Sequence, residues 1–194
     1  IISGNSQGIV INAADSNVIL GNAIGVALDG VTPLPNTAGG VELRAGASLN
    51  VVGGTVEGSR NTISGNGEWG LKIESAPLNQ VIGNFFGTDI TGTQVVANQS
   101  YSILFESAFG NSIGDGSSAG RNLIVAETIS EVGVLLRAGS VGNTIAGNWL
   151  GTNVSGDAPL GYFGSGIVLL DSDNNTLGGT TPEAANVIVQ YASQ

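Results

Sequence analysis

The chain contains no cysteine, no histidine and no methionine, and only 10% of its 194 residues are charged. Without Cys or His it has no thiolate nucleophile, no Ser-His-Asp triad and none of the usual zinc or haem sites. The sequence therefore predicts no metal and no cofactor. Low charge combined with 41% hydrophobic residues also argues against intrinsic disorder, which requires the opposite balance.

Basic residues are particularly scarce, since 5 Lys and Arg stand against 15 Asp and Glu and give a net charge of -10. Binding of nucleic acid requires clustered basic residues to neutralise phosphates, so nucleic acid is not an expected partner. No apolar run approaches the roughly 20 residues of a membrane span, so none is predicted in this segment. The acidic, Cys-free composition, rich in Gly and Asn, favours an extracellular or cell-surface bacterial protein.

Glycine is abundant, with 32 residues, and it disfavours helices by about 1 kcal/mol at each interior position. Asparagine-containing motifs recur at a long period. The segment NVILGN at 17–22 returns as NQVIGN at 79–84 and as NTIAGN at 143–148, at spacings of 62 and 64 residues. Two further markers keep this period, one at 50–54, 111–115 and 175–179, the other at 60–63, 121–124 and 185–188.

Each long repeat contains two similar halves, and each half carries a segment of the form Gly-apolar-x-apolar. This alternation with period two predicts a strand with one buried face. The inward columns are expected to be Ile9/Val41/Leu71/Ile103/Val134/Ile167 and Ile11/Leu43/Ile73/Phe105/Leu136/Leu169. The repeating unit is therefore a coil of 29 to 33 residues with three short strands.

Such coils stack best as a solenoid with parallel sheets. We expect about six coils, stacked into a rod near 30 Å long, with one asparagine at the start of each coil. Stacked asparagines would pair their amides along the rod and satisfy polar groups that are costly to bury. The coil starts, and hence the predicted ladder, are Asn17, Asn50, Asn79, Asn111, Asn143 and Asn175.

The Asn-x-Ile-x-Gly-Asn and Gly-Ile-x-Ile patterns cover essentially the whole chain, which resembles the right-handed parallel β-helices of bacterial surface proteins and of pectate-lyase-like, polysaccharide-processing enzymes. The resemblance implies the right-handed winding of an all-β solenoid. Residues 1–194 are expected to form a single domain. Because residues 2–5 match residues 63–66, the chain opens in mid-coil, and we expect a piece of a longer solenoid, with or without end-to-end assembly.

Charged residues on the Gly-led strands fall opposite one another in neighbouring coils. They could line a groove for a charged substrate, or they could form cross-strand pairs worth roughly 0.2–1 kcal/mol each. The second explanation is favoured because it accounts for three of the five basic residues. The expected pairs are Glu42 with Lys72, Arg44 with Glu74, and Glu106 with Arg137.

Two other sets of residues could carry catalysis. Arg60 and Arg121 precede equivalent asparagines and could act as the base of a lyase, although turn residues that bond carbonyls of the stack explain their repetition more simply. Asp171 and Asp173 lie two residues apart and could serve as the acid and base of a hydrolase, although a solvated turn is the favoured interpretation. Calcium requires six to eight oxygen ligands, and only these two carboxylates can be placed.

Loops 25–30, 87–92 and 151–156 align in series and are expected to project from one edge of the rod. The residue pairs before them predict a core column of Ile24, Phe86 and Leu150 and an outward column of Ala23, Phe85 and Trp149. Exposed aromatics beside polar loops would suit a polysaccharide or cell-surface glycan, unless both columns are packed under the loops. The candidate binding residues are Phe85, Thr88, Asp89, Trp149, Thr152 and Asn153.

These observations favour a non-catalytic structural or adhesive module of a large extracellular bacterial protein. Two alternatives stay open, namely a polysaccharide lyase or glycoside hydrolase, and a β-helix that binds glycans without turnover. An enzyme would require a cluster of carboxylates and basic residues on consecutive coils. A binding module would require an exposed aromatic groove.

Overall fold

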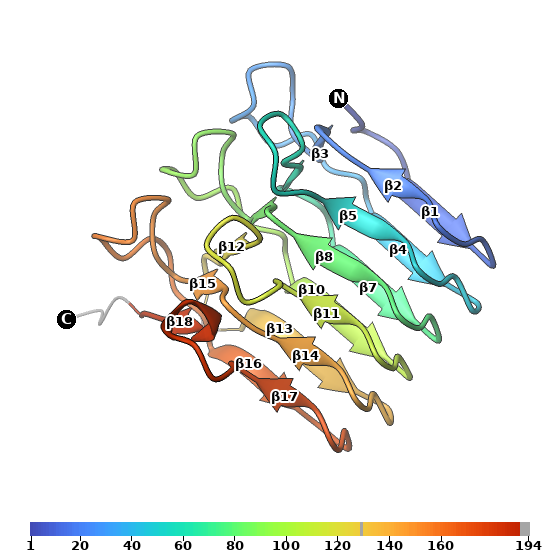
Figure 1. Ribbon diagram of the computed structural model, residues 1–194. Helices are drawn as coiled ribbons and strands as arrows, with labels where there is room; N and C mark the ends of the chain where they lie inside the picture. The colour runs from blue at the N-terminus through green and yellow to red at the C-terminus, as the bar shows by residue number, and fades with distance from the viewer. Residues whose placement is uncertain (129, 191–194) are drawn as a thin grey trace.

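The computed structural model describes residues 1–128 and 130–190, which form an all-β parallel solenoid with three sheets (Figure 1). Six strands in each sheet make about five complete coils. Sheet 1 contains β1 (Gln7–Asn12), β4 (Gly39–Arg44), β7 (Trp69–Glu74), β10 (Tyr101–Glu106), β13 (Val132–Arg137) and β16 (Ser165–Leu169).

The strands of the other two sheets are shorter. Sheet 2 contains β2 (Val18–Ile19), β5 (Val51–Gly53), β8 (Gln80–Ile82), β11 (Ser112–Ile113), β14 (Thr144–Ile145) and β17 (Thr176–Leu177). Sheet 3 contains β3 (Ala23–Ile24), β6 (Thr62–Ile63), β9 (Phe85–Phe86), β12 (Leu123–Ile124), β15 (Trp149–Leu150) and β18 (Val187–Ile188). The one helical turn among the described residues is the 3₁₀ helix η1 (Pro182–Ala184). No helix in this part of the chain is therefore long enough to cross a membrane.

Both inward columns predicted for sheet 1 are confirmed by the strand register. Ile9 pairs with Val41 and Ile11 with Leu43, and the same register continues along the sheet. Sheets 2 and 3 each add one apolar column, so the interior coils enclose a stack of branched and aromatic side chains with almost no exposed surface. Burial of such side chains, worth about 1.5–3 kcal/mol each, is the main force that holds the coils together.

The predicted asparagine ladder is also confirmed. It runs along the turn that precedes each strand of sheet 2. Asn79 shows the pattern, since its Oδ1 accepts the backbone N–H and the Nδ2 of Asn50, both at 2.9 Å. Its Nδ2 donates to Oδ1 of Asn111 at 3.1 Å and to the carbonyl of Ala47 at 2.9 Å. Each interior amide therefore binds its own coil to both neighbouring coils.

Two further ladders were not predicted as such. Between sheets 2 and 3, the last asparagine of the 17–22 marker and the asparagine of the 60–63 marker alternate with their repeats in one continuous ladder. Between sheets 3 and 1 a shorter ladder holds the turn that precedes the long strands. The members are Asn22, Asn61, Asn84, Asn122, Asn148 and Asn186 in the first, and Asn5, Asn36, Asn66 and Asn98 in the second.

The turn after each strand of sheet 1 has a left-handed backbone, with φ between 47° and 55° at residues that are not glycine. Small residues tolerate this conformation at a cost of roughly 1–2 kcal/mol. The positions are equivalent from coil to coil and all are exposed. They are Ala13, Ala45, Ser75, Ser107, Ala138 and Asp171.

The ladder predicts that the stability lost on removal of an asparagine depends on its position along the rod. Asn79→Ala removes the acceptor of two donors on Asn50, which is fully buried, and we expect a loss of about 2–4 kcal/mol in the free energy of unfolding. Asn17→Ala in the same ladder is the matched control. The Asn17 side chain accepts no bond from the described residues, so its loss should stay below about 1 kcal/mol. Urea denaturation measures both values, and equal losses would contradict this assignment.

Candidate functional site

Three hairpin loops form a row along one edge of the rod, as predicted. We call residues 26–33, 88–95 and 152–159 the hairpin loops, because each is closed by an antiparallel bridge between its first and last residues. The loops occur on alternate coils and contact one another across the coil between them. Ile90 N–H donates to the carbonyl of Gly30 at 3.1 Å, and Val154 N–H donates to that of Gly92 at 3.0 Å. The row is therefore a continuous wall (Figure 1).

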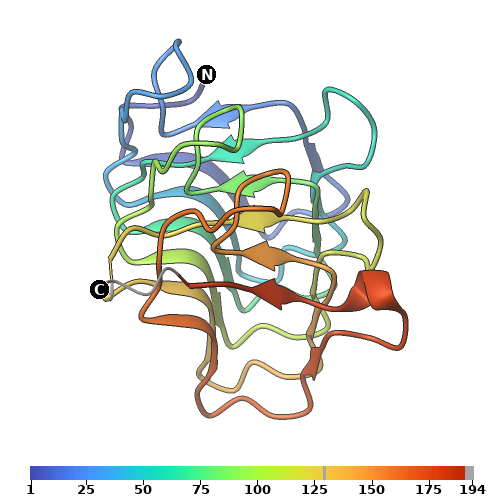
Figure 2. The same cartoon turned by 90° about the vertical axis from the view of Figure 1, so that its left-hand side faces the viewer.

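A second row of loops connects sheet 2 to sheet 3 on the remaining coils. We call residues 54–60 and 115–121 the arginine loops, since each ends in an arginine; in the third loop of this row, Ala185 occupies the corresponding position. Figure 2 looks onto sheet 3. The arginine loops lie at one end of its strands, and the hairpin loops lie over the strands. The two rows enclose part of the outer face of sheet 3.

The floor between the rows is the outward column of sheet 3. Phe85, Leu123 and Trp149 are consecutive in this column and form a small apolar cluster of their own, separate from the main core. The hairpin loops close over its rings, because a Cβ at Gly92 would meet the Phe85 ring and one at Gly156 would meet the Trp149 ring.

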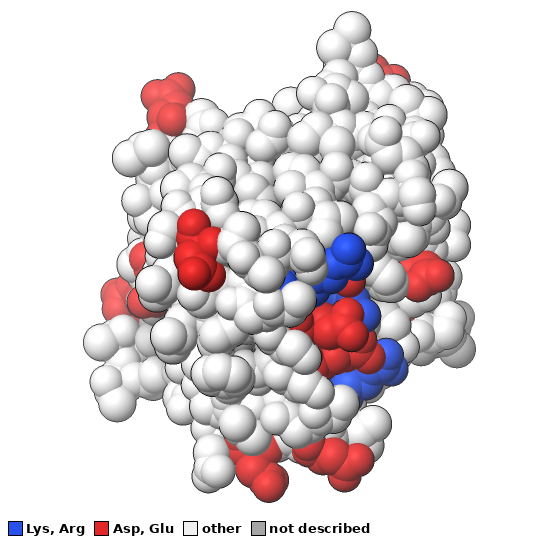
Figure 3. Space-filling model, turned by 90° about the vertical axis from the view of Figure 1, so that its right-hand side faces the viewer, with Lys and Arg blue, Asp and Glu red and all other residues white. Residues whose placement is uncertain are grey.

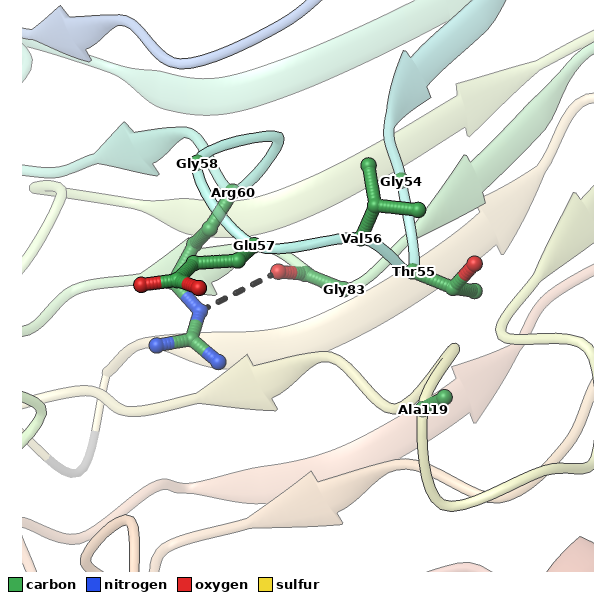
Figure 4. A pocket seen from close by; sticks show the side chains of 8 residues that line it. All are labelled: Gly54, Thr55, Val56, Glu57, Gly58, Arg60, Gly83 and Ala119. Atoms are coloured by element: carbon green, nitrogen blue, oxygen red, sulfur yellow. Dashed lines mark hydrogen bonds between the residues drawn. The ribbon is translucent and has the colours of Figure 1, made fainter.

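Each arginine loop places its guanidinium over an aromatic ring of the next coil. Arg60 lies 4.0 Å from the centroid of Phe85, and Arg121 lies 3.9 Å from that of Trp149. Nε of Arg60 donates to the carbonyl of Gly83 at 3.4 Å (Figure 4), and Nε of Arg121 donates to that of Gly147 at 3.2 Å. These bonds confirm the interpretation of both arginines as turn residues that bond carbonyls of the stack. The contact with the aromatic rings is an additional, cation–π interaction.

The two arginines line a common hollow of about 130 Å³, together with Phe85, Ala119, Trp149 and Val154. We call this hollow the arginine groove. An adjoining hollow of about 220 Å³ lies inside the first arginine loop and also reaches Arg60. Burial lowers the pKa of both guanidinium groups, but an arginine stays charged in a protein, so the groove is positive at any ordinary pH.

The hairpin loops use most of the predicted binding residues to hold their own shape. Thr88 and Thr152 are at most 1% exposed, and their hydroxyls donate to the carbonyls of Asp89 and Asn153. The Asp89 carboxylate, also 1% exposed, accepts the backbone N–H groups of residues 93 and 94. Burial raises the pKa of Asp89, but the hydrogen bonds from Thr91 and these amides outweigh it and lower the pKa.

Asn153 replaces that aspartate in the last hairpin loop, where its amide donates to Asp157 at 2.8 Å and the side chain is partly exposed. The outward direction predicted for Phe85 and Trp149 is confirmed, and the core column beside them is fully buried. However, Phe85 is only 3% exposed because Arg60 and the loop above cover it. Of the six predicted binding residues, only Trp149 and Asn153 retain accessible surface.

The outer face of sheet 1 carries the other three basic residues in a single cluster with carboxylates (Figure 3). The predicted neighbours in the register are correct, but only Glu106 and Arg137 bond as predicted. Lys72 binds Glu74 on its own strand at 2.9 Å and reaches diagonally to Glu106 at 2.7 Å.

The expected pairs of Glu42 with Lys72 and of Arg44 with Glu74 are therefore wrong. Instead, Nη1 of Arg44 binds Glu42 on its own strand at 3.2 Å, and Gln7 donates to the same carboxylate at 2.6 Å. Long side chains lean along their strand, so diagonal contacts are as accessible to them as the residue directly opposite.

Asp171 and Asp173 lie in the exposed turn after β16, where Asp171 has one of the left-handed conformations described above. Its equivalents in the earlier coils are alanine and serine, as the solvated-turn interpretation expects. Within residues 1–128 and 130–190, no group of three or more Asp and Glu side chains is placed to hold a metal ion.

Comparison of the chain with protein-family models, with curated proteins and with solved structures gives no match. The parallel β-solenoid fold therefore stands on the structure itself. The likeness to pectate-lyase-like β-helices stays a prediction.

The charged cluster on sheet 1 makes a prediction about acid stability. Burial raises the pKa of Glu106, but hydrogen bonds from Lys72 and Arg137 outweigh it and lower the pKa in the folded protein. The stability contributed by this carboxylate is therefore present above the ordinary glutamate pKa of about 4.3 and is lost as the pH falls through the lowered value.

We expect Glu106→Gln to be less stable than the parent at pH 7 and to lose less stability on acidification. Glu68→Gln is the control, because Glu68 is exposed and forms no ion pair with the described residues. Thermal melting between pH 7 and pH 3 measures the slopes; identical slopes for parent and Glu106→Gln would argue against a lowered pKa.

Proposed function

We propose that this chain is a non-catalytic structural or adhesive module of a large extracellular bacterial protein. The observation that carries the proposal is the direction of its polar contacts, which run from coil to coil along the rod. The amides of three ladders, the amides of stacked loops and the charges of sheet 1 all bind neighbouring coils. Such contacts stiffen a rod, whereas catalysis requires polar groups that converge on one point.

Head-to-tail association of such rods is part of the proposal, and the polarity of the ladders supports it. At the first coil, Oδ1 of Asn17 and of Asn22 accepts no bond from the described residues. At the last coil, Nδ2 of Asn175 and of Asn186 donates to a backbone carbonyl and to no further asparagine in the described part of the chain. The side-chain acceptors at the first coil thus match the side-chain donors at the last coil.

The last coil also exposes apolar side chains that interior coils bury. Leu177 is 49% and Ile188 is 51% exposed, whereas Ile145 and Leu150 in the preceding coil are fully buried. Covering these side chains with another coil would contribute favourable burial energy. A contact of this kind is heterologous and produces filaments rather than closed dimers.

Sedimentation velocity over a concentration series tests the association. We expect elongated oligomers of the parent chain and their loss in Leu177→Asp, which places a charge on the terminal coil. Ile90→Asp is the matched control, since Ile90 is 56% exposed in the middle hairpin loop, away from the two terminal coils. A strictly monomeric parent, or equal association of both variants, would argue against head-to-tail stacking.

Turnover assays separate this module from the alternative lyase or hydrolase. Incubation with acidic and neutral polysaccharides should release neither reducing sugars nor unsaturated products above the level of the heat-denatured chain. Product release that falls on substitution of Arg60, Arg121 or Asp171 would instead assign an enzyme.

A further inference from the structure

The five basic residues of the chain fall into two groups that differ in their partners. Arg44, Lys72 and Arg137 each bind a carboxylate on sheet 1. Arg60 and Arg121 have no carboxylate within 4.0 Å among residues 1–128 and 130–190. Each uses only its Nε in a hydrogen bond to that part of the chain, so the Nη groups are available to a ligand.

The two free guanidinium groups are held in fixed positions. Each is stacked on an aromatic ring and bonded at Nε to a backbone carbonyl, and these contacts remove most of its rotational freedom. Because the arginine loops repeat every second coil, the two groups are about 9–10 Å apart along the rod. Preorganised donors of this kind bind without a large loss of side-chain entropy.

We propose that the arginine groove binds an acidic glycan that carries a carboxylate on every second sugar, with one carboxylate at Arg60 and the next at Arg121. A guanidinium offers a planar fork of N–H donors that matches a carboxylate, and the separation of the two forks is about the length of a disaccharide. The net charge of -10 repels polymers of dense charge, so single charges spaced along an otherwise neutral chain fit this surface better.

The groove also provides surface for the sugar between the two carboxylates. Trp149 is partly exposed and Val154 is 38% exposed, and both line the hollow between the arginines. The apolar face of a pyranose ring can pack on such side chains. Glu57 opposes binding, because it lines the adjoining hollow with Arg60 (Figure 4).

Affinity electrophoresis in gels that contain hyaluronate, which alternates uronate and neutral sugars, tests the proposal. We expect the parent chain to be retarded by hyaluronate at low salt and not by neutral dextran. Arg60→Gln and Arg121→Gln should each weaken the affinity about tenfold or more, because each removes a charge-assisted contact. Glu57→Gln should strengthen it, and retardation should decrease as salt is added.

Arg137→Gln is the matched control, since Arg137 is bound to Glu106 on another face and its removal should leave the affinity unchanged. Circular dichroism verifies the fold of each variant. If a Gln variant does not fold, Arg60→Lys and Arg121→Lys replace it; they keep the charge and the alkyl stem, lose the planar fork and should weaken binding severalfold.

The proposal is overturned if hyaluronate does not retard the parent, if dextran retards it equally, or if the double variant of Arg60 and Arg121 binds like the parent. Stronger competition by polyaspartate than by hyaluronate oligosaccharides would assign an acidic peptide instead. The inference goes beyond the structural role proposed above. Its failure would leave sedimentation and unfolding unchanged, so the two proposals fail separately.

Discussion

The structure depends on one interaction, the hydrogen bond between the side-chain amides of asparagines in successive coils. A solenoid must turn three times per coil, and each turn buries backbone groups that no strand satisfies. An asparagine at the turn accepts from the coil before it and donates to the coil after it. The amide thereby fixes the register of neighbouring coils, and the apolar columns inside stack only in that register.

Whether a ladder can be predicted from the sequence depends on how regularly its asparagines are spaced along the chain. The ladder of Asn79 keeps intervals of 29 to 33 residues, so a search for a constant period finds it. The ladder between sheets 2 and 3 has intervals of 39, 23, 38, 26 and 38 residues, because loops are inserted alternately on either side of sheet 3. At the period of the long repeat, alternate asparagines of this ladder belong to two different motifs. The sequence therefore does not indicate that these asparagines contact one another.

The candidate site was only partly predictable for a related reason. The row of hairpin loops and the outward direction of Phe85 and Trp149 follow from the repeat. The stacking of Arg60 on Phe85 joins a residue before one strand to a residue in the next coil, and it becomes visible only when the register of sheet 3 is known. Thr88, Thr152 and Asp89 are polar in the sequence but are buried in the structure, where their side chains bond backbone groups of their own hairpin loops.

Hydrogen exchange of the backbone amides of Asn50, Asn79 and Asn111 tests the central role of the ladders most directly. In each of these residues the backbone N–H donates to a side-chain oxygen of the next asparagine and to no strand. If the ladder holds the coils in register, these amides should exchange as slowly as those of the central strands of sheet 1. Exchange as fast as that of the exposed hairpin-loop amides of residues 31 and 32 would contradict the account.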